Sequence, residues 1–114
     1  MRVRYIPPMD LQEKHLPGMN YAGPGTNVAL RQKMGVRPMD QLDKAALQHD
    51  IVTEPRGPYL SNGDARKLRA ADRKLMNKAR ALVLSGYRPA WKAVAVAAAM
   101  EALLLTGARG RTIQ

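Results

Sequence analysis

Two stretches of the chain place apolar residues on one face of an α-helix, and a third is apolar on all sides. The first covers residues 42–53, where Asp40 can cap the start and Asp43 lies in the first turn, a position that suits the helix dipole. Pro55 ends the pattern near Thr53, because a proline cannot continue a helix and restricts the residue before it. We therefore predict a helix between Asp40 and Thr53.

The second stretch is longer, and the third is more apolar. Residues 61–64 offer caps for a helix whose apolar side chains fall in an arc of about 140° and which ends near Leu84. Residues 90–106 carry only two charges, and their small apolar side chains point in all directions, as in a buried, oligomeric or membrane-associated helix. Because this segment is Ala-rich and short for a membrane span, we favour a packing helix, with Trp91 in the core or at a lipid interface.

The other segments show no helical period. Residues 1–20 are interrupted by prolines and are expected to form an extended arm. Residues 27–37 are polar and basic, with Gly35 as a breaker, and no element is assigned to them. The tail, residues 107–114, is rich in Gly and Arg and is expected to be mobile. The pattern as a whole predicts a mainly α fold.

Composition narrows the class of protein. A chain of 114 residues with 46% hydrophobic residues is long enough for one domain with a modest core. It has no cysteine, which excludes disulfides, a cysteine nucleophile and a cysteine-bound metal. The net charge of +10 predicts attraction to phosphate, on nucleic acid or on anionic lipid. No apolar run follows Met1-Arg2-Val3-Arg4, so no signal peptide is expected.

One histidine and two aspartates are the candidate chemistry of the predicted helices. His49 falls in the middle of the inward face of the first helix, with Asp50 on its flank. Asp72 is the only charge on the apolar stripe of the second helix, and a buried carboxylate needs a partner. For His49 alone, a buried imidazole satisfied by a neighbour is the simplest interpretation. Because both side chains face inward, we predict that the two helices pack antiparallel and that Asp72 accepts a hydrogen bond from His49.

The segment from Tyr21 to Thr26 contains Gly23 and Gly25 on either side of a proline, which forces a tight turn. An ordinary turn is the simpler interpretation of this segment taken alone. The alternative is an oxygen cage, in which backbone carbonyls bind a hard cation such as calcium and a carboxylate from elsewhere, here Asp50, completes the site. No Gly-Lys-Ser/Thr follows, so the segment is not a phosphate-binding Walker loop.

A base, an orienting acid and a calcium ion together make a hydrolase that needs no protein nucleophile. In this interpretation His49, held by Asp72, activates a water molecule, while the metal polarises an ester carbonyl and stabilises the oxyanion. No serine stands in a Gly-x-Ser-x-Gly motif, so an acyl-enzyme route has no support.

Three motifs occur in order along the chain: Tyr21-x-Gly23-Pro24-Gly25, Leu42-Asp43-x-Ala45-Ala46-x-x-His49-Asp50 and Ala71-Asp72-x-x-Leu75. Together with the approach Leu16-Pro17-Gly18-x-Asn20-Tyr21, they resemble the phospholipase A2 domain of parvovirus minor capsid proteins and, more distantly, secreted phospholipases A2. The resemblance covers about residues 16–83. It suggests an N-terminal arm (1–15), a phospholipase A2-like domain (16–86), and an apolar helix with a basic tail (87–114).

The resemblance implies a calcium site. Tyr21, Gly23 and Gly25 would give backbone carbonyls to Ca²⁺, and Asp50 would give its carboxylate. The backbone N–H of Gly23 would join the calcium ion at the oxyanion.

The resemblance also implies a catalytic pair, with one departure. His49 would be the general base for water attacking the sn-2 ester of a glycerophospholipid, and Asp72 would orient it. The family usually has a tyrosine where this chain has Thr53, and that hydroxyl normally supports the orienting aspartate. Thr53 is shorter, and Tyr59 in the following loop is a candidate substitute. Losing one supporting bond should weaken catalysis rather than abolish it.

Cysteine-free members of the family are viral. The resemblance therefore implies a capsid-associated protein of the virion that opens a host endosomal or other intracellular membrane, with phospholipid and other capsid proteins as partners. Two other hypotheses stay open: a structural, membrane-binding capsid protein with a weakened site, and a basic nucleic-acid-binding capsid protein. The residues expected to dock on anionic lipid are Arg66, Arg69, Arg73 and Lys74.

Overall fold

The computed structural model describes residues 3–8, 19–22, 26–53 and 60–109. In these ranges the protein is mainly α, with four helices and no strand. The helices are α1 (Val28–Lys33), α2 (Gln41–Thr53), α3 (Ala65–Leu84) and α4 (Ala90–Thr106). Helices α2, α3 and α4 confirm the predicted elements. Helix α1 has no counterpart in the prediction, because six residues are too few to display a helical period.

Local signals set the helix bounds. The side chain of Asp64 caps α3 by accepting a hydrogen bond from the backbone N–H of Arg66, at 2.8 Å. The side chain of Asp40 likewise accepts from the backbone N–H of Asp43 at the start of α2, at 3.0 Å. Helix α4 ends at Gly107, whose φ of 71° is a left-handed conformation that glycine adopts without strain. The chain can therefore turn back at that point.

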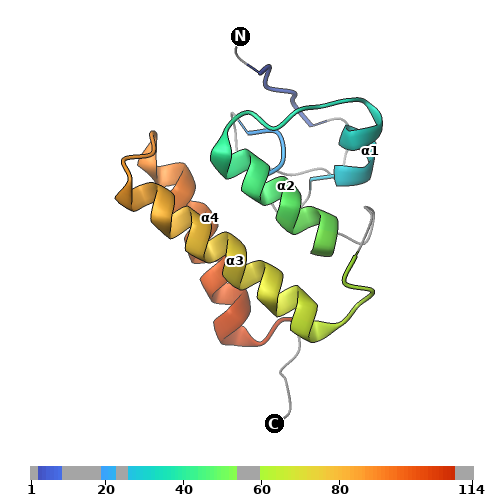
Figure 1. The fold of residues 1–114 in the computed structure, drawn as a ribbon, viewed down its shortest axis with the longest axis vertical. Coiled ribbons are helices and arrows are strands. Elements are labelled where there is room, and N and C mark those ends of the chain that lie inside the picture. The colour runs from blue at the N-terminus through green and yellow to red at the C-terminus, as the bar shows by residue number, and fades with distance from the viewer. Residues whose placement is uncertain (1–2, 9–18, 23–25, 54–59, 110–114) are drawn as a thin grey trace.

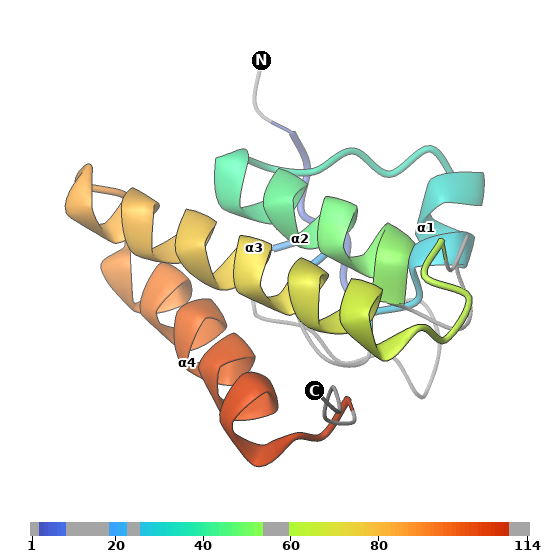
Figure 2. The same cartoon turned by 60° about the horizontal axis from the view of Figure 1, so that its bottom comes forward.

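Helix α3 is the centre of the fold. Helix α2 runs antiparallel beside it, and α4 packs along its other side (Figures 1 and 2). Both helices contribute to the hydrophobic core, α3 with Leu75, Ala79 and Leu82 and α4 with Ala93 and Val96. The small residues among them let the two helices approach closely. The antiparallel packing of the first two predicted helices is confirmed, and α4 is a packing helix as expected.

Part of α4 keeps an apolar outer surface. Trp91 is 52% exposed and Leu105 is 72% exposed, so the alternative that placed Trp91 in the core is wrong. An ion pair between Arg80 and Glu101 joins α3 to α4 at the surface. Within the described ranges, no helix combines the length and the apolarity needed to cross a lipid bilayer.

Buried polar side chains attach the N-terminal arm to the helices. Asn20 is fully buried, and its Nδ2 donates to the backbone carbonyls of Arg4, at 2.8 Å, and Arg37, at 2.9 Å. The buried guanidinium of Arg31 donates to the carbonyl of Pro7 at 2.9 Å. Polar atoms at these positions have lost water, so each such bond avoids a large desolvation cost. The arm is thereby held close to residue 21, where the calcium-binding turn was predicted to start.

Candidate active site

A histidine and an aspartate from neighbouring helices form the centre of the site. His49 lies near the end of α2, and Asp72 lies in the first half of α3. The Nε2 atom of His49 is 2.7 Å from Oδ1 of Asp72. The side chain of Asp72 is fully buried, and His49 is 8% exposed. The predicted hydrogen bond between the two helices is confirmed.

This bond determines which nitrogen of His49 can act as a base. An ionised carboxylate only accepts hydrogen bonds, so Nε2 of His49 must carry the proton that it donates to Asp72. Nδ1 is then the nitrogen with the lone pair. It lies 3.2 Å from Oδ1 of Asp50 and 3.5 Å from Oγ1 of Thr53. Burial by itself lowers the pKa of His49, but hydrogen bonds to Asp50 and Asp72 outweigh it and raise the pKa.

Asp72 has a second partner that sequence reasoning missed. Arg109 donates from Nε to Oδ2 of Asp72 at 3.2 Å and from Nη2 to Oδ1 at 3.3 Å. Burial raises the pKa of the Asp72 carboxyl, but the bonds from His49 and Arg109 outweigh it, so the pKa lies below its ordinary value. The prediction of a mobile tail is therefore wrong for Arg109, which is ion-paired to the site. Residues 110–114 lie outside the described part of the chain.

Asp43 organises the other side of the site. It is fully buried, and its carboxylate accepts backbone N–H groups from Asn20, at 2.9 Å, and Tyr21, at 2.6 Å. A third N–H, from Met39, is 2.8 Å away. Sequence analysis assigned Asp43 to the first turn of a helix and gave it no further role. Its carboxylate in fact sets the backbone just before the predicted calcium-binding turn.

The Tyr21 side chain is also fixed. Its hydroxyl donates to the carbonyl of Val36 at 2.6 Å and accepts from Nε2 of Gln32 at 2.8 Å. Burial raises the pKa of the Tyr21 hydroxyl, and the carboxylates of Asp43 and Asp50 act in the same direction. Residue 21 is therefore held on α2 through Asp43.

Two of the four residues predicted to bind calcium, Tyr21 and Asp50, lie within the described part of the chain. Among the described residues, no cluster of three or more His, Cys, Asp or Glu side chains could hold a metal. A cation on Asp50 would therefore need neutral oxygen ligands, which is the donor chemistry predicted for the turn after Tyr21 and the chemistry that calcium prefers. Gly23 and Gly25, including the N–H of Gly23 assigned to the oxyanion, lie outside the described residues. The donor set present fits calcium, and the calcium site remains a prediction.

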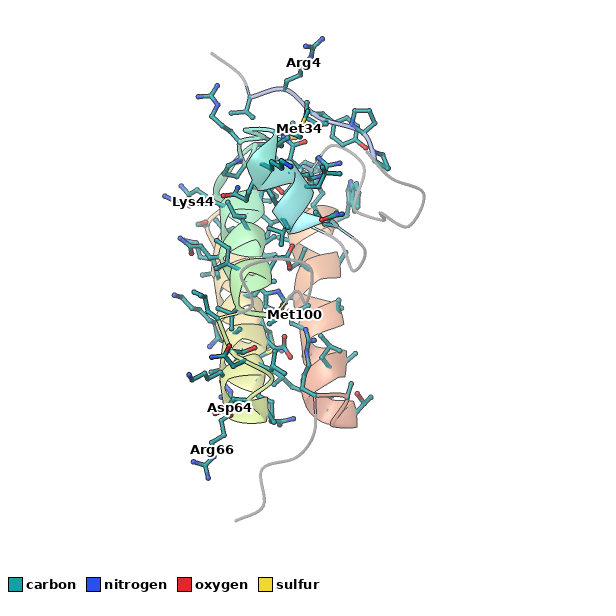
Figure 3. All side chains as sticks on the ribbon, turned by 90° about the vertical axis from the view of Figure 1, so that its right-hand side faces the viewer. Arg4, Met34, Lys44, Asp64, Arg66 and Met100 are labelled. Carbon is teal, nitrogen blue, oxygen red and sulfur yellow. The ribbon has the colours of Figure 1, made fainter. Side chains whose placement is uncertain are left out.

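The structure describes most of the residues predicted to support the site or to contact lipid. Thr53 is near Nδ1 of His49, and within the described ranges it makes no hydrogen bond to Asp72. Tyr59, the candidate substitute, lies outside those ranges. Arg69 turns toward α4 and donates to the carbonyl of Leu104 at 3.4 Å. Three of the basic residues assigned to lipid are exposed on α3: Arg66 at its start (Figure 3), Arg73 and Lys74.

A groove runs between α2 and α3 beside His49. It has a volume of about 1130 Å³, and His49, Val52 and Leu75 are among its lining residues. Among the described residues, its lining includes lysines from both helices and no carboxylate. Figure 3 shows one of them, Lys44, projecting away from α4. The lysines are Lys44, Lys67, Lys74 and Lys78. The structure thus places cationic side chains over an apolar groove next to the site.

Comparison with known protein families shows the family to which this chain belongs. The profile described as "Phospholipase A2-like domain" matches residues 12–82, which is more than half of the chain. The chain belongs to the phospholipase A2-like domain family. No curated protein and no solved structure matches the chain. In this phospholipase A2-like domain, His49, Asp50 and Asp72 lie inside the matched range, whereas Arg109 lies beyond its end.

Proposed function

We propose that this phospholipase A2-like domain is a calcium-dependent phospholipase A2 that hydrolyses the sn-2 ester of glycerophospholipids. The observation that carries the proposal is the buried bond between His49 Nε2 and Asp72 Oδ1, which leaves Nδ1 as the basic nitrogen. Family membership supports the reaction class, because the matched range contains both residues. The family match does not specify the sn-2 position or the calcium requirement, which are proposed here from the residues of the site.

The chain's own residues have separate roles in this mechanism. His49 takes a proton from a water molecule at Nδ1, and that water attacks the ester carbon. Asp72 keeps the proton of the ring on Nε2 and stabilises the imidazolium that forms. When the tetrahedral intermediate collapses, the imidazolium returns the proton to the leaving alcohol, so that one ester bond is replaced by a free fatty acid and a lysophospholipid. No covalent enzyme intermediate is needed.

Calcium would be held by the carboxylate of Asp50 and the backbone carbonyls of Tyr21, Gly23 and Gly25. When bound, it supplies a positive charge that polarises the ester carbonyl and stabilises the oxyanion. Asp43 supports this role indirectly, because it fixes the backbone N–H groups of residues 20 and 21. The backbone is thereby fixed at the start of the predicted calcium-binding turn.

Attraction to anionic lipid is the proposed way in which the protein reaches its substrate. Four lysines line the groove, and the chain carries a net charge of +10. Each Lys or Arg close to an anionic membrane contributes about 1 kcal/mol of binding free energy. We also propose, from the resemblance to viral proteins, that the protein is associated with a capsid. Its partners would be other capsid proteins, and its target would be an endosomal membrane.

Positional analysis of the products tests the reaction. Phosphatidylcholine and phosphatidylglycerol that carry different acyl chains at sn-1 and sn-2 would be incubated with the protein and calcium. The proposal expects only the sn-2 fatty acid and the matching lysophospholipid. Release of both chains, or of the sn-1 chain, would contradict it. Binding to nucleic acid with a steep salt dependence, and no hydrolysis, would favour the packaging hypothesis instead.

A further inference from the structure

The orienting aspartate is held by a residue from outside the matched family range. Asp72 receives one hydrogen bond from His49 and two from Arg109. We propose that Arg109 is a positioning residue, which fixes the carboxylate of Asp72 and through it the imidazole of His49. It would take the part that the family resemblance assigns to a tyrosine hydroxyl at the position of Thr53. This inference rests on the proposed hydrolase function of the same site.

The need for a second donor follows from burial. The side chain of Asp72 is fully buried, and His49 engages only its Oδ1 atom. A buried carboxylate oxygen without a donor carries a desolvation cost that no interaction offsets. Arg109 removes that cost, because its Nε–H reaches Oδ2 while its Nη2–H shares Oδ1 with His49. Three donors on two oxygens also stop the carboxylate from rotating away from the imidazole.

The residue at the family's tyrosine position does not supply this support. Thr53 follows His49 by one helical turn, and its Oγ1 lies 3.5 Å from Nδ1, on the far side of the ring from Asp72. A hydroxyl there interacts with the base itself rather than with its orienting acid. The charge on Arg109 also differs from a hydroxyl, because it partly balances the carboxylates of Asp50 and Asp72 on either side of one imidazole.

The fold brings Arg109 to Asp72 in two steps. Helix α4 ends at Gly107, and the chain then turns back beneath the first half of α3 (Figure 2). The last turn of α4 is itself fixed, because the guanidinium of Arg69 donates to the carbonyl of Leu104. Arg69 precedes Asp72 by three positions on α3, so both contacts lie on the same part of that helix. The side chain of Arg109 is 25% exposed, which leaves its bond to Asp72 partly shielded from water.

Kinetics of Arg109 variants test the proposal. In Arg109→Ala the account expects kcat for fatty-acid release to fall about 10- to 100-fold, the usual cost of losing such a supporting contact. The apparent KM for vesicles should stay within about twofold, because the guanidinium is bonded to Asp72 and not to lipid. Arg109→Lys should recover part of kcat, since an ammonium keeps the charge but not the paired donors. Lys33→Ala, which removes an exposed charge at the end of α1, is the matched control and should behave as wild type.

A second readout does not depend on lipid hydrolysis. The Nε2 proton of His49, bonded to a buried carboxylate, should give a slowly exchanging downfield proton signal in the folded protein. That signal should broaden or disappear in Arg109→Ala and return in Arg109→Lys. Wild-type kcat together with an unchanged signal in Arg109→Ala would overturn the proposal. If the signal responds as expected but the wild-type protein releases no fatty acid, the positioning role stands and the hydrolase function fails.

Discussion

Oδ1 of Asp50 lies 3.2 Å from Nδ1 of His49, the nitrogen that must take a proton in the proposed reaction. Both atoms are acceptors when the imidazole is neutral, so this contact is favourable only when the ring carries a second proton. With Asp72 on Nε2, the imidazole then stands between two carboxylates. These two contacts favour the imidazolium over the neutral base.

The first prediction concerns the pKa of His49. In metal-free protein we expect it above the ordinary 6.5, and we expect Asp50→Asn to lower it. In the presence of calcium, activity should rise as the pH rises through the pKa that His49 has in that state, because only the neutral ring is a base. The stability that comes from the charged ring runs the other way: it is fully present below pH 6.5 and lost above the raised pKa. Proton NMR on a His15→Gln background, which leaves His49 as the sole histidine, measures the titration. An unchanged pKa in Asp50→Asn would contradict this account.

The second prediction concerns acid stability. The pKa of Asp72 is lowered in the folded protein, so its contribution to stability is present above the ordinary value of 3.8 and is lost as the pH falls through the lowered pKa. Asp72→Asn should therefore be less stable than wild type at pH 7, with a smaller difference at pH 3. Chemical denaturation at both pH values measures this. A difference that grows on acidification would have the wrong sign for a carboxylate with a lowered pKa.

The third prediction concerns Asp43. Its buried carboxylate accepts three backbone N–H groups, and an amide would turn an N–H₂ toward some of them. Asp43→Asn should lower the free energy of unfolding by on the order of 3 kcal/mol. Asp64→Asn is the control, because asparagine caps a helix as well as aspartate does and Asp64 is exposed. Equal stability of the two variants would mean that Asp43 does not hold residues 20 and 21.

The helices and the pairing of His49 with Asp72 could be predicted from the sequence because their signals are local. Caps, breakers and the 3.6-residue period all act within a few residues, which is why α2, α3 and α4 have the expected bounds. The pairing of His49 with Asp72 followed from a single charge on an apolar stripe. Such a carboxylate needs a partner, and the inward-facing histidine was available.

The supporting residues could not be found in the same way. Arg109 lies in a Gly/Arg-rich tail whose composition is typical of a mobile segment, and only the packing of α4 on α3 brings it to Asp72. Asp43 looks like an ordinary first-turn acid, because its backbone partners at residues 20 and 21 belong to a segment with no periodic pattern. The hydrogen bonds of Asn20 to Arg4 and Arg37 could not be predicted for the same reason. Long-range hydrogen bonds leave no signature in the spacing of one element.

Calcium-dependent fatty-acid release tests the central claim most directly. Mixed phosphatidylcholine and phosphatidylglycerol vesicles would be incubated with the protein in calcium or in EDTA, beside His49→Gln and Asp50→Asn. The account predicts release in calcium only, reduced in His49→Gln by about 10²- to 10⁴-fold and lost in Asp50→Asn. No release by folded wild-type protein that still binds the vesicles would contradict it. The pair of His49 and Asp72 would then be a structural feature of a membrane-binding protein.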